Sequence, residues 1–129
     1  MAKKILIVDD EPDVTMFLST LLRKNGYETV TATDADKGLE AVRTEKPDLI
    51  SLDLLMSHKS GINMLQELRT NEETSDIPVV IVTGFRKENV PEMDFIEWLR
   101  ESFSKPPEAY LEKPVDEQAF LNAVKKEIG

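Results

Sequence analysis

The sequence of 129 residues has no cysteine, one histidine and one tryptophan, and its aromatic residues make up only 6% of the chain. Without cysteine the chain can form neither disulfides nor thiolate metal sites. This composition suits a reducing compartment, and we expect a cytoplasmic protein. The single histidine, His58, falls in a predicted loop, where we expect an exposed side chain rather than a catalytic or phosphotransfer group.

Long apolar runs and basic clusters are also lacking. No stretch is long enough to be predicted as a transmembrane helix. The opening MAKKILIVDD has a four-residue apolar run that ends in acids, which predicts a strand rather than a signal peptide. The chain has 16 basic residues against 25 acidic ones, a net charge of −9. We therefore expect neither nucleic acid nor membrane as a partner.

What the sequence does contain is an alternation of short β-branched runs with segments of helical periodicity. The predicted strands are 5–8, 27–31, 49–52, 79–82 and 109–111. Five helices are predicted. The first runs from Pro12 to the Asn25-Gly26 stop and has its apolar face formed by Val14, Phe17, Leu18, Leu21 and Leu22. The second spans 35–44, the third follows a Ser60 cap with Ile62, Leu65 and Leu68 inward, the fourth spans 91–103, and the fifth is capped by Asp116 with Phe120, Val124 and Ile128 inward.

This alternation predicts a single α/β domain over residues 1–129. Near-continuous apolar strands separated by amphipathic helices indicate a parallel sheet that is covered on both faces. In such sheets ligands bind outside the carboxyl ends of the strands, which is therefore where we expect the functional site.

Polar residues gather where four of the predicted strands end. Because the carboxyl ends of parallel strands meet at one edge of the sheet, we expect these side chains to lie together. After the first, third, fourth and fifth strands they are, in turn, Asp9, Asp10 and Glu11; Asp53; Thr83 and Gly84; and Lys113.

Each of these residues alone has a simpler interpretation. Acids are common at a helix start, Asp53 could cap a turn, Thr83 could end a strand, and Lys113 could be a solvated loop residue. Their joint placement favours a site. Crowded carboxylates repel one another, and Mg²⁺ relieves this with oxygen ligands and phosphate. Asp53 would then be a nucleophile toward phosphorus, with Lys113 and Thr83 contacting phosphoryl oxygens.

The stretches ILIVDDEP, PDLISLDLLM, VVIVTG and YLEKPV, in this order, resemble the receiver domain of bacterial two-component response regulators. The resemblance implies a flavodoxin-like fold with five helices and strand order 2-1-3-4-5. It also implies roles for particular residues: Asp53 as phosphoacceptor; Asp9, Asp10, Asp53 and the Leu55 backbone carbonyl as Mg²⁺ ligands; Thr83 and Lys113 as phosphoryl contacts; Leu54 and Gly84 as backbone contacts; and Thr83 with Tyr110 as the switch pair.

The sequence departs from the family pattern in two places. Ser57 stands where the family usually has proline, and KSG replaces the frequent MDG while keeping Gly61. The segment from Thr83 to Lys113 is longer than usual, with SKPPEAYLEKP in place of the common Gly-Ala-Asp-Asp turn. The fourth predicted helix and its flanks are therefore the individual part of this chain.

The leading hypothesis is a stand-alone phosphorylation-dependent switch that is not an enzyme beyond its own phosphorylation and dephosphorylation. Its expected partners are a histidine kinase or phosphotransfer protein, and a downstream protein or second copy. The downstream contact is expected on the surface of the fourth helix, fifth strand and last helix. One alternative is an aspartyl-nucleophile phosphatase of the haloacid dehalogenase type, which would need an Asp where Leu55 stands. Another is a phosphate-independent interaction domain.

Trp98 lies off the apolar stripe formed by the other large residues of the fourth predicted helix, which are Phe95, Ile96, Leu99 and Phe103. Two interpretations remain open. The segment FSKPPEAY could fold back and cover the indole within the monomer, or Trp98 could belong to a face that contacts a partner or a second copy.

Overall fold

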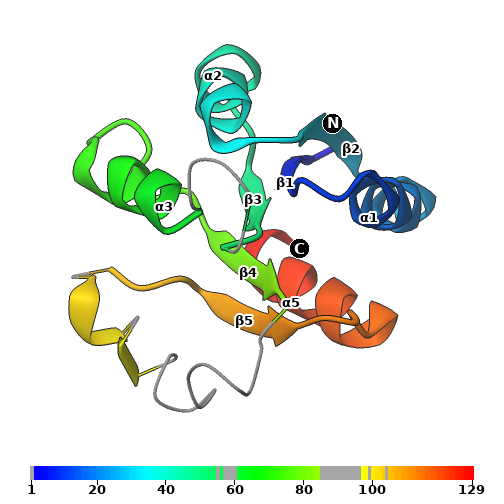
Figure 1. Cartoon of the computed structure of the whole chain (residues 1–129). Helices are drawn as coiled ribbons and strands as arrows, with labels where there is room; N and C mark the ends of the chain where they lie inside the picture. Colours follow the sequence, from blue (N-terminus) through cyan, green and yellow to red (C-terminus); the bar gives the residue numbers. More distant parts are fainter. Residues whose placement is uncertain (1, 55, 57–60, 85–96, 99, 104) are drawn as a thin grey trace.

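The computed structural model describes residues 2–54, 56, 61–84, 97–98, 100–103 and 105–129. Five parallel strands form one sheet in the order β2-β1-β3-β4-β5, with helices on both faces (Figure 1). The elements are β1 (Lys4–Val8), α1 (Pro12–Lys24), β2 (Glu28–Ala32), α2 (Ala35–Glu45), β3 (Leu49–Leu52), α3 (Gly61–Thr70), β4 (Val79–Thr83), β5 (Ala109–Glu112) and α5 (Glu117–Ile128). This is the predicted flavodoxin-like fold.

The fourth predicted helix is represented by residues 97–98 and 100–102, which are helical. The remainder of the predicted span 91–103, apart from Phe103, lies outside the described residues, as do the Ser60 cap and His58. The predicted cap at Asp116 is confirmed, since its side chain accepts a hydrogen bond from Ala119 N at 2.8 Å.

The hydrophobic core is divided by the sheet into two layers, because successive strand residues point to opposite faces. Leu6 and Val8 of β1 pack with α2 and α3 in one layer. Ile5 and Ile7 pack with α1 and α5 in the other. All four side chains are buried. Figure 1 shows the same division, with α2 and α3 on the face of the sheet opposite α5.

The prediction for α1 was wrong at one position. Phe17 was expected inward, but it is 40% exposed, and the neighbouring Met16 is 67% exposed. Phe17 lies at the edge of the apolar stripe, and only Leu18 and Leu22 at its centre become fully buried. Along the part of the chain that the structure describes, no helix has the length and apolarity needed to cross a bilayer.

Candidate functional site

The site is built at the carboxyl edge of the sheet, where backbone pairing continues one residue past the strands. Asp9 N donates to Ala32 O at 3.1 Å, and Asp53 N donates to Val8 O at 3.0 Å. Lys113 N donates to Thr83 O at 2.9 Å. These hydrogen bonds fix the backbone of the predicted residues on four neighbouring strands, so the expected convergence of their side chains is observed.

Asp53 lies at the centre of this group and is only 2% exposed. Its Oδ1 accepts a hydrogen bond from Thr83 Oγ1 at 2.8 Å, and its Oδ2 lies 3.3 Å from Lys113 Nζ. A buried carboxylate is tolerated only when such partners compensate its lost hydration. The arrangement leaves Asp53 rigidly held between a neutral donor and a cation.

Lys113 joins the acids of two strands. Its ammonium lies 2.8 Å from Asp9 Oδ2 and 3.4 Å from Glu11 Oε1, in addition to its contact with Asp53. Burial alone would lower the pKa of Lys113, but the hydrogen bond that Lys113 donates to Asp9 and the charges of Asp53 and Asp9 outweigh it and raise that pKa above its usual value. Lys113 is therefore held in the charged form.

The carboxyl of Asp9 is only partly compensated. Burial raises its pKa, the charge of Asp53 adds to the rise, and the hydrogen bonds from Lys113 and from the Glu11 backbone offset it in part. The Glu11 N–H donates to Asp9 Oδ1 at 2.9 Å. A further positive charge near Asp9 would therefore stabilise its ionised form.

A hard divalent cation bound by the neighbouring carboxylates would supply this positive charge. One carboxylate oxygen from each of Asp9, Asp10 and Asp53 can be chosen so that all three lie within 4.8 Å of one another. The donor set is oxygen only, and Asp10 is half-buried at the opening. These residues fit Mg²⁺, which prefers a few carboxylates and completes its shell with water and phosphate. Leu55, the fourth expected ligand, lies outside the described residues.

Glycines shape the surroundings of Asp53. A Cβ at Gly61 would clash with the Asp53 carbonyl oxygen and lie 2.7 Å from Leu54 Cα. The start of α3 therefore packs directly against the backbone of Asp53 and Leu54, and Leu54 is fully buried there. Among the described residues, the nearest atom to a Cβ added at Gly84 would be Lys113 Cδ at 3.8 Å, which is ordinary van der Waals contact.

A groove of about 600 Å³ adjoins the site on the α1 side. Lys113, Gly84 and the exposed Phe17 line it, together with Glu11, Asp13, Val14, Pro114 and Val115. The place of Phe17 in this groove was not predicted, because helical periodicity assigned the residue to the core. Two adjacent large apolar residues, Met16 and Phe17, were the available indication, since a single inward face does not need both.

Tyr110, the expected switch residue, sits in the middle of β5, where it pairs with Ile81 of β4. Its side chain is half-buried and packs against the α2/α3 layer of the core. Thr83 lies two residues past Ile81 on β4, so the strand pair β4–β5 connects Tyr110 with the contact between Thr83 and Asp53.

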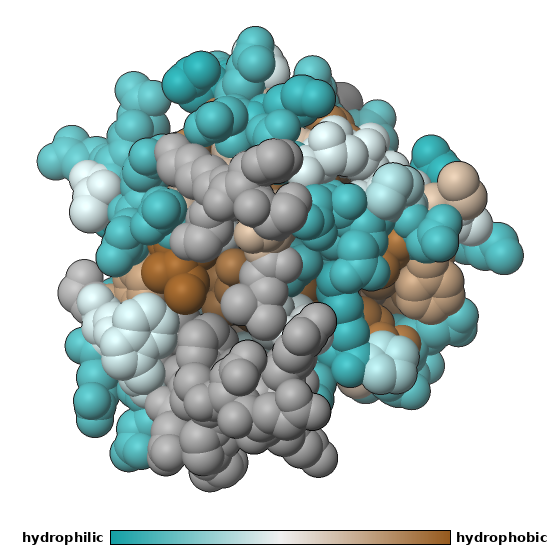
Figure 2. Space-filling view, in the orientation of Figure 1, coloured by the Kyte–Doolittle hydropathy of each residue, from teal (hydrophilic) through white to brown (hydrophobic). Residues whose placement is uncertain are grey.

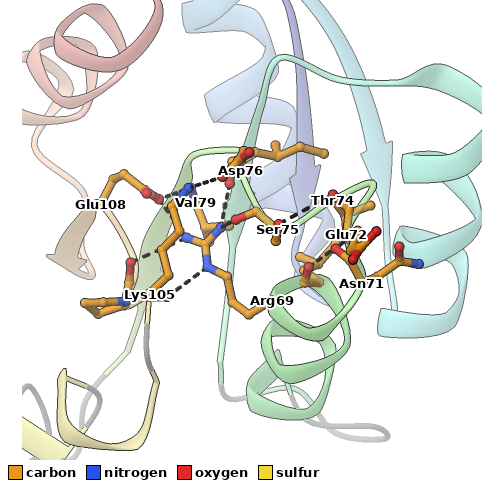
Figure 3. Close-up of polar contacts among 12 residues, drawn as sticks. Arg69, Asn71, Glu72, Thr74, Ser75, Asp76, Val79, Lys105 and Glu108 are labelled. Atoms are coloured by element: carbon orange, nitrogen blue, oxygen red, sulfur yellow. Dashed lines mark hydrogen bonds and ion pairs between the residues drawn. The ribbon is translucent and has the colours of Figure 1, made fainter.

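A second polar cluster, which the sequence did not reveal, lies at the opposite edge of β4 and β5 (Figure 3). The Arg69 side chain is 4% exposed and pairs with Glu108 at 2.8 Å. Its guanidinium also donates to the carbonyls of Ser75, Ile77, Lys105 and Pro106. Glu108 in turn accepts from Val79 N at 2.7 Å. This cluster ties the end of α3 to the starts of both strands.

The comparison with known families agrees with this geometry. Residues 5–125 match the family described as "Response regulator receiver domain". The chain belongs to this family. Receiver domains are signalling domains rather than classical enzymes, and they bind Mg²⁺ at an acidic pocket and interact with histidine kinases or phosphotransfer proteins.

Individual relatives support the assignment over the whole chain. "Protein PilH" of Pseudomonas aeruginosa is 35% identical over 94% of this chain and 93% of its own. "Polar-differentiation response regulator DivK" of Brucella ovis is 30% identical over 100% of this chain and 98% of its own. Other curated relatives are longer, and the chain spans 47% of one transcriptional regulator and 34% of another.

Among solved structures, a CheY-like response regulator receiver domain protein from Methanospirillum hungatei superposes with a TM-score of 0.81 at 25% identity. The match covers 98% of this chain and 93% of that one. The fold and family predicted for this receiver domain from its sequence are thus confirmed.

Proposed function

We propose that residues 1–129 act as one receiver domain that accepts a phosphoryl group on Asp53 and signals through the resulting change in shape. The observation that supports this most directly is the position of Asp53, which is 2% exposed and lies between Thr83 Oγ1 at 2.8 Å and Lys113 Nζ at 3.3 Å. A strand-end carboxylate so held is rigid and next to a cation that can receive phosphoryl oxygens.

In the proposed reaction, a carboxylate oxygen of Asp53 attacks the phosphorus of a phosphohistidine. A new O–P bond forms and the P–N bond breaks, its electron pair returning to the imidazole nitrogen, which takes up a proton from solvent. Lys113 stays protonated throughout, because its pKa is raised. Asp9, Asp10 and Asp53 would hold Mg²⁺, which when bound neutralises charge on the phosphoryl oxygens.

We propose that the phosphodonor docks over the start of α1. Met16 and Phe17 are 67% and 40% exposed, and Phe17 lines the groove that leads to Lys113. An exposed apolar pair next to the acceptor would position a helical histidine-bearing partner in line with Asp53.

Output is proposed to run along β4 and β5. Thr83 Oγ1 would exchange the Asp53 carboxylate for a phosphoryl oxygen, and the half-buried Tyr110 would respond through the β4–β5 pair. The surface formed by helical residues 97–98 and 100–102, β5 and α5 would then present a changed face to a downstream protein or to a second copy. Trp98, in the first of these ranges, is 44% exposed, so the interpretation that the chain covers its indole within the monomer is wrong.

The test is incubation with Mg²⁺ and acetyl phosphate, followed by intact mass measurement. We expect one phosphoryl adduct, which Asp53→Ala abolishes and which chelation of Mg²⁺ prevents. A matched control, Asp48→Ala, removes an exposed acid whose carboxylate contacts Lys4 N far from the site, and it should label normally. An adduct that persists in Asp53→Ala would overturn the assignment.

A further inference from the structure

Lys113 is shared by three carboxylates. Its Nζ lies 2.8 Å from Asp9 Oδ2, 3.3 Å from Asp53 Oδ2 and 3.4 Å from Glu11 Oε1. A lysine ammonium has three N–H donors and no acceptor, so each of the three carboxylates can take one donor. A phosphoryl oxygen that is to bind Lys113 must therefore displace one of these acids.

The three contacts differ in how easily they can be given up. Asp9 and Asp53 are each 2% exposed, and a buried carboxylate that loses its cation does not regain its hydration. The Glu11 side chain is 62% exposed and makes the longest of the three contacts, so water can replace Lys113 there at little cost. Glu11 is therefore the acid that an incoming anion displaces most readily.

The start of α1 places Glu11 for this contact. Glu11 is the N-cap residue of that helix, but within the described part of the chain its side chain accepts no capping hydrogen bond. Its backbone N–H donates to Asp9 Oδ1 at 2.9 Å. Glu11 thus holds Asp9 through its backbone and Lys113 through its side chain, although it lies 102 residues from Lys113 along the chain.

The Glu11 carboxylate also lies where an anion would approach. Glu11, Gly84 and Lys113 line the same groove of about 600 Å³ beside the site. Figure 2 shows teal, hydrophilic atoms in the middle of the molecule, which adjoin tan and brown, hydrophobic atoms on the side of α1. An anionic group that reaches Lys113 through the groove meets a carboxylate of the same charge, which opposes its binding.

We propose that Glu11 is a positioning residue for Lys113, whose Oε1 takes the place of a phosphoryl oxygen until the phosphoryl group arrives. This role depends on the proposed phosphorylation of Asp53. No bond to Glu11 forms or breaks: its carboxylate exchanges Lys113 for water, and Lys113 exchanges Glu11 for a phosphoryl oxygen. Because the carboxylate and the phosphoryl group compete for one cation, Glu11 weakens the binding of the phosphoryl group.

The test compares affinities for beryllofluoride at saturating Mg²⁺, with the fluorines in the place of phosphoryl oxygens and the amide chemical shifts of residues 109–112 as the signal. Glu11→Gln keeps the length of the side chain and removes its charge. We expect this variant to bind beryllofluoride about two- to fivefold more tightly than the wild type. Glu117→Gln makes the same substitution at an exposed acid of α5, and its affinity should stay within about 1.5-fold of the wild type.

A second measurement follows the displacement of Glu11 in the wild type. The NMR signal of its side-chain carboxyl carbon can be assigned from its absence in Glu11→Gln. When beryllofluoride binds, we expect this signal to move toward the chemical shift of the exposed Glu117 carboxyl. A purely structural role of Glu11 at the start of α1 would not produce this movement.

An affinity of Glu11→Gln equal to or weaker than that of the wild type would overturn the proposal, as would an equal gain in Glu117→Gln. A Glu11 carboxyl signal that does not move on binding would overturn it as well. In each of these cases the wild type still binds beryllofluoride, and the proposed function stands. A wild type that neither binds beryllofluoride nor is labelled by acetyl phosphate would instead reject the proposed function, and the role of Glu11 with it.

Discussion

Thr83 Oγ1 donates to Asp53 Oδ1 at 2.8 Å, which joins the ends of β4 and β3 by a side-chain contact inside the core. Both residues are essentially buried, Thr83 at 0% and Asp53 at 2% exposed. The hydroxyl is thus already aimed at the expected acceptor, so phosphorylation would require it to change partner over a short distance rather than to swing in from elsewhere.

Thr83→Ala should separate acceptance of the phosphoryl group from its effect on β5. Because Asp53 and Lys113 remain, we expect the variant to label with acetyl phosphate. Amide chemical shifts of residues 109–112 should respond to beryllofluoride in the wild type and much less in Thr83→Ala. Stability should fall by about 1 kcal/mol for the lost buried hydrogen bond. Thr83→Ser keeps the hydroxyl and is the control; a full β5 response in Thr83→Ala would contradict the coupling.

Gly61→Ala should be far more damaging than Gly84→Ala. A Cβ at Gly61 meets the backbone of Asp53 and Leu54, which cannot yield, whereas a Cβ at Gly84 makes ordinary contact with Lys113. We expect a loss of about 1–3 kcal/mol in the free energy of unfolding for Gly61→Ala, measured by urea denaturation. Equal stabilities of the two variants would show that α3 shifts away from the loop freely.

Arg69→Ala should cost about 3–5 kcal/mol, because it leaves Glu108 and several carbonyls without their buried partner. The measurement is chemical denaturation. Lys105→Ala is the matched control: it removes the ion pair with Asp76, whose side chain is 93% exposed, and should leave the midpoint nearly unchanged. A small change in the free energy of unfolding for Arg69→Ala would contradict this, and would mean that water hydrogen-bonds to Glu108 and the carbonyls in place of the guanidinium.

Asp9 gives a prediction with a definite sign against pH. Its pKa is raised in the folded chain, so its contribution to stability is fully present below the unfolded value of 3.8 and is lost as pH rises through the folded pKa. The free energy of unfolding of Asp9→Asn minus that of the wild type should therefore grow between about pH 4 and pH 7.

Mg²⁺ should reverse this difference. At about pH 7 the ion binds the folded wild type and raises its stability by mass action. It should do so much less in Asp9→Asn, which lacks one of the three carboxylates. Thermal denaturation with Mg²⁺ and with a chelator checks both statements. The same stabilisation of both proteins by Mg²⁺ would remove Asp9 from the metal site.

The predictions from sequence succeeded where neighbours along the chain decide the structure. The central strands β3 and β4 are buried along their whole length, and Asp116 is a local cap. The start of β2 was wrong by one residue, since Tyr27 N bonds to Leu22 O and belongs to the turn after α1. Joint placement of Asp9, Asp53 and Lys113 followed from topology, because parallel strands end at one edge.

The features missed were those that depend on distant partners. Arg69 contacts Lys105 and Glu108, which are 36 and 39 residues away along the chain, and no local pattern encodes that pairing. The prediction that Phe17 is buried was wrong for a related reason. Helical periodicity places Phe17 on the apolar face, but whether another element covers it depends on where α5 and the loop after β5 lie.

The division of the core into two layers has a consequence for recombination between relatives. Leu6 and Ile7 are adjacent in β1, yet each faces a different set of helices. A crossover between two homologous genes transfers contiguous residues. Each of the two core layers of the chimera then contains side chains from both parents. A chimera that inherits one intact layer would instead have to exchange alternate residues of each strand, together with the two helices that cover that face.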